Sequence, residues 1–462
     1  MCRTGHSGFP NEDSRMTTAG ILVLGRRRPG FDPEWASHIV GRVTEQLRSA
    51  AFVALRPAAP IVDEATLEVA VVECQSKGVD TLVVLQPTMS DGNLAVALDR
   101  LWTGPLVLWA TPERPDGSMI SSCSLVGTHV FASTLRQLRH PFELVYGMPG
   151  LSETAAQLHA AVRLAVAAQR LRRSKVGLVG SHAPGFVNMA SDPFELRQQL
   201  GPQLRQFGLH EFQDLVQSVA AAEVDKDLAT FRELGIPLLD MTESDLPLAS
   251  RYYLAMKHLF ITEGIDALAV RCWPECPSML GQWPYVGMAR LATEEFPIAC
   301  EGDVDGAVCC LAGALLEFGQ GYLSDWLEHD RSTITLWHGG NACLGLCEAV
   351  GAEFGPRAAC HFNNRKPGVL DANLKAGVPI TLFRFWRCDG EYRLMVREAS
   401  TIQPRRLLRG TNGLAELPGT DVAALFEELC HAGMPHHVAV FGGQHAATLR
   451  RLARLLNVRV MA

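Results

Sequence analysis

The strongest constraint on the fold is a rhythm of short apolar runs and amphipathic stretches that the chain goes through twice. Ile21–Leu24 is an apolar run bounded by glycines, as is typical of a buried parallel strand. Asp32 can cap a helix that follows, with Pro33 at its first position and an end near Arg48. The alternation continues with strands at 51–55, 81–85 and 106–109 and helices at 63–76 and 93–101. Such alternation predicts a doubly wound parallel sheet.

The same rhythm starts again after an expected linker helix at 153–173. Lys175–Gly180 is the next apolar run with glycines. We expect further strands at 267–270 and 297–299 and helices at 193–207, 224–234, 244–263, 285–295 and 304–318. The sequence therefore predicts two α/β domains with Rossmann-like parallel sheets.

The last third of the chain has a different composition. Thr333–Trp337, Ile380–Trp386 and Tyr392–Val396 are strand-like, and the stretches between them are rich in Gly, Pro, Asn and Arg. This pattern predicts a mostly β, barrel-like domain that ends with a strand, a helix and a last strand at 438–461. The predicted boundaries are a disordered leader at 1–15, an N-terminal α/β domain with its linker helix at 16–173, a second α/β domain at 174–318 and a β-rich domain at 319–462. Met16 is an alternative start.

Composition excludes several classes of protein. Of the 462 residues, 47% are hydrophobic and 20% are charged, which is ordinary for a globular chain. The net charge of −7 argues against a nucleic-acid surface. No secretory signal and no apolar run long enough for a membrane span occurs, and the 13 cysteines form no regular framework. We therefore predict a cytoplasmic protein with reduced thiols and no membrane partner.

Three separated clusters carry side chains suited to chemistry. Glu301 and Asp303 follow the expected strand at 297–299, at the strand end where α/β sheets bind ligands. Asp325 lies just past an expected helix end, on what reads as a linker, and His436 and His437 precede an expected strand. Plainer interpretations stay open, since Asp303 could cap the next helix and the other two acids could be turn residues. Adjacent histidines in extended chain point in opposite directions, so we expect only His437 to face a site.

Two carboxylates and one imidazole suit a divalent cation such as Mn²⁺. Three protein ligands would leave coordination positions for two neighbouring sugar oxygens and a water. The sequence therefore makes Glu301, Asp325 and His437 candidate metal ligands.

The order of these motifs resembles the L-fucose/L-arabinose isomerase family. The resemblance rests on Ala299–Asp303, on Asp325 about two dozen residues later, and on His437 before a glycine-containing strand and helix. It implies a metal-dependent aldose–ketose isomerase that acts on a monosaccharide through a cis-enediol(ate). Glu301 and Asp325 would be the acid/base pair as well as metal ligands. The family also implies a homo-oligomer, a trimer or hexamer, with shared active sites.

The resemblance also places further residues at the substrate. Arg271 and Trp273 follow the expected strand at 267–270, and His338 ends another, so we expect all three to bind substrate. The loop with Arg27 and Arg28 is expected to contact substrate too, and guanidinium groups there could bind a phosphate or sulfonate.

Other functions remain open from the sequence. The enzyme could isomerise a sulfonated or phosphorylated sugar. A non-catalytic sugar-binding or regulatory protein is a second alternative, since two α/β domains can close on a sugar. A nucleotide-dependent oxidoreductase is a third, because Gly177–Gly180 faintly suggests a dinucleotide loop, although the spacing is wrong for one.

Overall fold

The computed structural model describes residues 17–26, 31–58 and 60–461. Within them the chain divides into two compact units, one formed by residues up to 170 with 454–457 and the other by 171–453 with the last residues. The predicted leader at 1–15 lies outside the described residues. None of the helices in the described part is long and apolar enough to cross a membrane.

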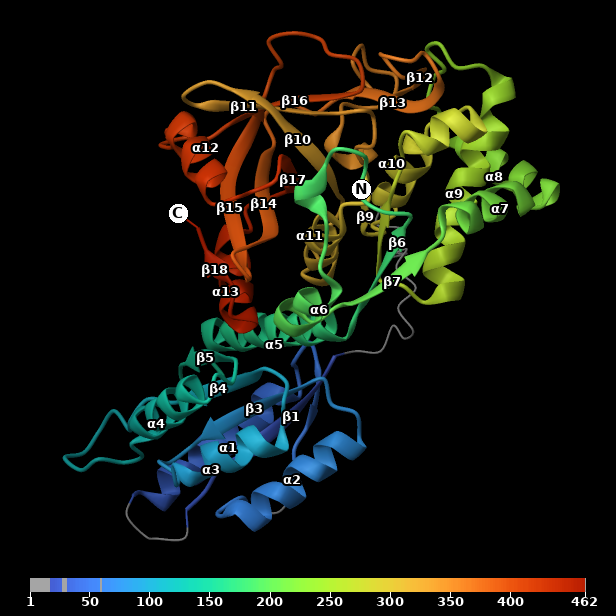
Figure 1. Cartoon of the computed structure of the whole chain (residues 1–462). Helices are drawn as coiled ribbons and strands as arrows, with labels where there is room; N and C mark the ends of the chain where they lie inside the picture. Colours follow the sequence, from blue (N-terminus) through green and yellow to red (C-terminus); the bar gives the residue numbers. More distant parts are fainter. Residues whose placement is uncertain (1–16, 27–30, 59, 462) are drawn as a thin grey trace. The chain divides into compact units, whose positions relative to one another are not determined.

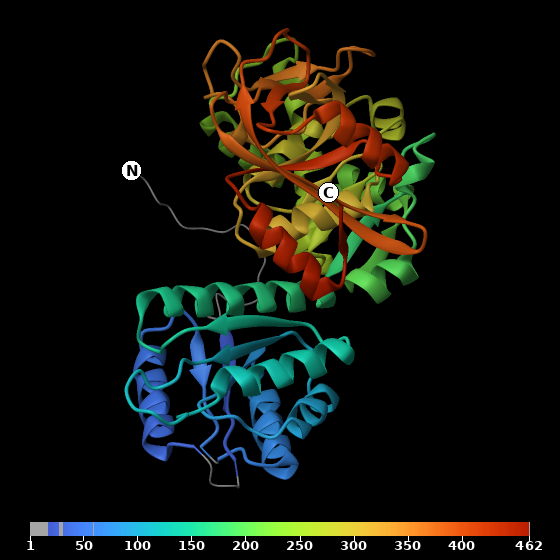
Figure 2. The same cartoon turned by 90° about the vertical axis from the view of Figure 1, so that its left-hand side faces the viewer.

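The N-terminal unit is a five-stranded parallel sheet with helices on both faces (Figures 1 and 2). The strand order is β2-β1-β3-β4-β5. The strands are β1 (Thr18–Val23), β2 (Val53–Leu55), β3 (Thr81–Gln86), β4 (Leu106–Ala110) and β5 (Phe142–Tyr146). The helices are α1 (Pro33–Leu47), α2 (Glu64–Ser76), α3 (Asn93–Leu101), α4 (Ser124–Gln137) and α5 (Ser152–Arg173).

Alternation along the strands gives this sheet two cores. In β3, Leu82 and Val84 pack with α2, α3 and α4, whereas Val83 and Leu85 pack with α1 and α5. The Asp32 carboxylate accepts hydrogen bonds from the first turn of α1, and Pro33 occupies its first position, as predicted. The predicted doubly wound domain is therefore confirmed.

The second unit begins with a four-stranded parallel sheet of order β7-β6-β8-β9. These strands are β6 (Lys175–Val179), β7 (Gln203–Phe207), β8 (Ala267–Val270) and β9 (Ile298–Ala299). The accompanying helices are α6 (Pro193–Glu195), α7 (Leu209–Ser218), α8 (Ala221–Glu233), α9 (Leu246–Glu263), α10 (Tyr285–Thr293) and α11 (Val304–Leu315).

Six antiparallel strands of the same unit close into a barrel. The pairing runs β16-β11-β10-β17-β14-β15, and β15 pairs back onto β16. These strands are β10 (Gly321–His329), β11 (Thr333–His338), β14 (Pro379–Cys388), β15 (Glu391–Ile402), β16 (Thr411–Glu416) and β17 (His437–Gly442). The remaining elements are β12 (Arg357–Cys360), β13 (Pro367–Asn373), β18 (Arg459–Val460), α12 (Val422–His431) and α13 (Ala446–Leu456). The predicted fold class, parallel α/β domains followed by a barrel, is confirmed.

Helix α11 joins the small parallel sheet to the barrel (Figure 1). It contacts β8 and β9 as well as β14 and β17. Gly313 makes room for the ring of Phe441 in β17, and the backbone N–H of Phe385 in β14 donates to the Cys309 sulfur. The carboxyl end of β9 and the barrel strands are thereby held side by side.

Two expectations were wrong in ways that matter for the site. The helix expected at 193–207 stops at Gly201, where a left-handed backbone followed by Pro202 ends the turn, and β7 follows. Asp325 lies inside strand β10 rather than on a linker. The glycines before β10 resemble a loop in sequence, but here they only end the turn after α11.

Candidate active site

Strand pairing brings two of the candidate residues face to face. Asp325 in β10 is directly opposite His437 at the start of β17. Residues directly opposite in paired antiparallel strands have side chains on the same face of the sheet. Glu301 comes from a different element, the turn between β9 and α11, where its φ of 61° and that of 69° at Gly302 reverse the chain sharply.

Both carboxylates lie close to one nitrogen of His437. His437 Nε2 lies 3.2 Å from Glu301 Oε2 and 3.4 Å from Asp325 Oδ1. His437 is fully buried and Glu301 is 8% exposed. Glu301 Oε2 and His437 Nε2 are buried and have no hydrogen-bond partner among the described residues. Such orphaned atoms are the donor set that a divalent cation would satisfy.

Burial and charge act in opposite directions on these groups. Burial alone raises the pKa of Glu301, but the contacts with His436 and His437 outweigh it and hold the pKa well below its usual range. The pKa of Asp325 is also lowered, because His437 more than offsets its burial. Burial lowers the pKa of His437, but the carboxylates of Asp303, Asp325 and Glu301 raise it well above its ordinary value. The carboxylates are therefore ionised and ready to accept a positive charge.

A second layer of charge holds His437 from behind. Its Nδ1 lies 2.8 Å from Asp303 Oδ2, and Arg384 reaches both oxygens of Asp303, at 2.5 and 2.8 Å. Asp303 and Arg384 are fully buried. Asp303 also accepts from Gly306 N–H and so caps α11, which the sequence left open as a plainer interpretation. Because Asp303 accepts at Nδ1, the Nε2 lone pair of a neutral His437 would point at the carboxylates.

Trp273 and His338 line the cavity beside these carboxylates. The cavity has a volume of about 420 Å³. Trp273 Nε1 donates to Glu301 Oε1 at 2.7 Å and so fixes the carboxylate plane. His338 Nδ1 accepts from Gly339 N–H at 2.8 Å, which places the proton on Nε2, 2.9 Å from the Cys300 sulfur. Burial lowers the pKa of His338, which favours the neutral ring. Among the described residues, Cys300, His338 and His437 form one group of potential metal ligands, and Glu301, His436 and His437 form another.

The structure places one predicted substrate residue, Arg271, outside the lining of the cavity. Its guanidinium is occupied by a two-point ion pair with Glu275 and a bond to Ser181. Arg27 and Arg28 lie outside the described residues.

Sequence reasoning missed several residues that the fold brings to the site. His436 was expected to point away, yet its Nε2 lies 3.8 Å from Glu301 and 3.7 Å from Asp325. It precedes β17, so the alternation of a strand does not apply to it. His361 and Lys366, on the loop between β12 and β13, also line the cavity. The sequence signal for this loop is the segment His-Phe-Asn-Asn-Arg-Lys, which is rich in polar side chains and lies between two strands.

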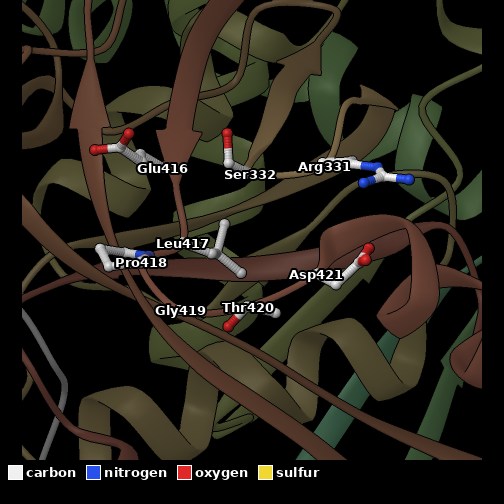
Figure 3. Close-up of a pocket in the computed structure, with 8 residues that line it drawn as sticks. All are labelled: Arg331, Ser332, Glu416, Leu417, Pro418, Gly419, Thr420 and Asp421. Atoms are coloured by element: carbon white, nitrogen blue, oxygen red, sulfur yellow. The ribbon is translucent and has the colours of Figure 1, made fainter.

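A separate hollow of about 530 Å³ lies at the turn between β16 and α12. Figure 3 shows Glu416 on one side of this hollow and Arg331 and Asp421 on the other. The backbone N–H groups of Leu417 and Val422 donate to the carbonyl oxygens of Ser332 and Arg331, and Asp421 caps α12. This hollow has the features of a surface turn, whereas the cavity at Glu301 has converging titratable groups.

Comparisons with known proteins agree with an isomerase. The chain is 27% identical over 449 residues to the sulfoquinovose isomerases of Priestia aryabhattai and Priestia megaterium, covering 96% of this chain and 98% of each relative. A sulfoquinovose isomerase of Alkalicoccus urumqiensis is 26% identical over 390 residues, 83% of this chain and 86% of that protein. No protein-family model matches the chain.

These relatives confirm the predicted enzyme class, an aldose–ketose isomerase. None of these relatives is named as an L-fucose isomerase, so membership of the L-fucose/L-arabinose isomerase family stays a prediction. The roles of Glu301, Asp325 and His437, and the identity of a metal, also stay predictions.

Proposed function

We propose that the chain is a divalent-metal-dependent aldose–ketose isomerase whose substrate is a sulfonated monosaccharide. The observation that supports the metal is the approach of both carboxylates to His437 Nε2, at 3.2 Å from Glu301 and 3.4 Å from Asp325. Glu301 Oε2 and His437 Nε2 are also buried without a hydrogen-bond partner among the described residues. The substrate rests on the full-length similarity to proteins named sulfoquinovose isomerase. The choice of a sulfonated sugar is one of the alternatives that the sequence left open.

Glu301, Asp325 and His437 are the residues that would hold the cation, with Mn²⁺ as the expected ion. One imidazole and two carboxylates suit such an ion. When bound, a divalent cation supplies Lewis-acid stabilisation of the negative charge that develops on the sugar oxygens. The cavity wall leaves one side of this group open to a ligand.

The chain's own carboxylates would move the proton. On the enediol(ate) path, a base removes the proton from carbon 2 of the aldose, an acid delivers a proton to carbon 1, and the hydroxyl proton on O2 passes to O1. Glu301 and Asp325 are ionised and fixed in place, so we assign them as this pair, working through a cis-enediol(ate). The Trp273 bond holds Glu301 Oε1, and Oε2 is the oxygen that faces His437.

The test is turnover of a sulfonated aldose, followed by NMR, with Mn²⁺ and after treatment with a chelator. We expect activity that Mn²⁺ restores. Glu301→Gln keeps the shape of the side chain and its bond with Trp273, so it should fold normally and lose at least about 10³-fold in kcat. Full turnover in the chelator, or near-normal turnover of Glu301→Gln, would reject the mechanism. Metal-independent sugar binding without product would favour the non-catalytic alternative.

A further inference from the structure

The cavity has a wall that the isomerisation chemistry does not use. Glu301 and Asp325 lie at β9 and β10, whereas His361–Lys366 forms the loop between β12 and β13. In the strand order, β16 and β11 separate β13 from β10. A sugar with carbons 1 and 2 at Glu301 and Asp325 would therefore extend its other end toward this loop.

Lys366 is an uncompensated cation on this wall. Its side chain is half-buried, and its ammonium donates to the backbone oxygen of Pro277. No carboxylate of the described residues forms an ion pair with it, whereas the neighbouring Arg365 is paired with Asp240. An ammonium has three N–H donors, so two are available for a ligand. A half-buried charge is most stable when an opposite charge meets it.

Asn364, two residues before Lys366, also lines the cavity. Asn364 Oδ1 accepts from Trp283 Nε1 at 3.0 Å and from the Lys366 backbone N–H at 3.2 Å. These two donors assign the oxygen, and the Asn364 NH₂ group is left as a donor on the cavity wall. Trp283 is itself held by stacking on His361, with ring centroids 4.2 Å apart.

The charge count distinguishes between the anions that a sugar could carry. A sulfonate bears one negative charge, whereas a phosphate monoester bears close to two near neutral pH. Lys366 is the single lysine or arginine among the described residues that line the cavity. One ammonium with neutral amide donors balances a monoanion.

We propose that Lys366 and the Asn364 amide bind the sulfonate group of the substrate, at the end of the cavity away from Glu301 and Asp325. This assignment rests on the proposed isomerase function. The sequence suggested that Arg27 and Arg28 could bind such an anionic group, whereas the proposal assigns it to Lys366 and Asn364. The ammonium supplies charge-assisted hydrogen bonds to the sulfonate oxygens, and the loop between β12 and β13 selects the substrate.

The test compares two sugars that differ only in the sulfonate, a 6-sulfo aldose and the corresponding aldose with a 6-hydroxyl group. Lys366→Met should lower kcat/KM for the sulfonated sugar about 10- to 100-fold, mostly through KM, because a hydrogen bond to a charged group is lost. The neutral sugar should change less than about threefold, since its chemistry at Glu301 is untouched. Lys375→Met, at an exposed lysine that does not line the cavity, is the matched control and should change neither.

A second variant keeps the local fold. Asn364→Asp retains an oxygen for Trp283 and for the Lys366 N–H but places a negative charge beside the sulfonate. It should reduce kcat/KM for the sulfonated sugar at least as much as Lys366→Met does, and Lys366→Arg should recover part of the activity.

The outcomes separate this assignment from the proposed function. Equal losses on both sugars, no loss on either, or a wild-type preference for the 6-phosphorylated aldose would overturn the sulfonate site while leaving an isomerase in place. A wild-type enzyme that isomerises none of the three sugars would overturn both.

Discussion

At the residue scale, His437 is the side chain on which the site depends. It faces the two carboxylates with one nitrogen and Asp303 with the other, and Arg384 balances Asp303. A carboxylate behind a ligating histidine fixes the ring and makes it a stronger ligand. From the sequence, Asp303 could belong to a functional cluster or cap the next helix. The structure shows the cap, and the same carboxylate contacts His437, so one side chain serves the fold and the site together.

Asp303→Asn tests this second layer. A neutral amide leaves Arg384 buried without a counter-charge, so the free energy of unfolding should fall by about 3–5 kcal/mol. The amide also holds His437 less firmly, so Mn²⁺ affinity should fall about 10- to 100-fold. Thermal melting and calorimetric titration with Mn²⁺ measure the two effects.

Asp227→Asn is the control for stability alone. Asp227 and Arg290 form a similar buried two-point ion pair in the α8 and α10 region. Asp227→Asn should lower the free energy of unfolding by about as much as Asp303→Asn does, and it should leave the Mn²⁺ affinity unchanged. Equal effects of the two variants on Mn²⁺ affinity would show that Asp303 acts only through stability.

At the element scale, strands and helices with strong apolar periodicity were predicted correctly from the sequence. The prediction failed for a segment that is a strand only because of its pairing with other strands. The rhythm at β1, β3, β8 and α11 follows from local patterns. The position of Asp325 in β10 does not, because a polar segment becomes a strand only when β11 and β17 pair with both its edges. For the same reason, the placement of Asp325 opposite His437 depends on the register between β10 and β17, which could not be predicted from a single sequence.

Gly302→Ala tests the turn that carries Glu301. Gly302 has a φ of 69°, and a Cβ there would overlap the backbone oxygen of Ser181. The turn must shift to relieve the overlap, so we expect about 1–3 kcal/mol less stability and about 10- to 100-fold lower kcat as the carboxylate moves.

The matched control for that turn is Gly377→Ala. Gly377 has a φ of 78°, but a Cβ there meets no atom within 4 Å. Gly377→Ala should lower the stability through backbone strain and leave kcat unchanged. Stability and kcat that fall together in both variants would mean that the turn does not position Glu301.

At the scale of the whole molecule, the residues of the proposed site belong to one of the two compact units. All residues that line the cavity lie between 273 and 366, inside the unit formed by residues 171–453. The N-terminal unit has its own two cores and contributes none of these groups. The trimer or hexamer with shared sites that the family resemblance implies remains a prediction, which light scattering would test.

Calorimetry with and without Mn²⁺ tests this division. A ligand that binds only the native state stabilises it by about 2.7 kcal/mol at 100 times its Kd. Because Glu301, Asp325 and His437 all lie in the larger unit, Mn²⁺ should raise the Tm of that unit by about 5 °C and leave the transition of the N-terminal unit in place. Glu301→Gln removes one ligand charge and should abolish most of the shift. An equal shift of both transitions, or the same shift in Glu301→Gln, would mean that Mn²⁺ binds elsewhere in the chain.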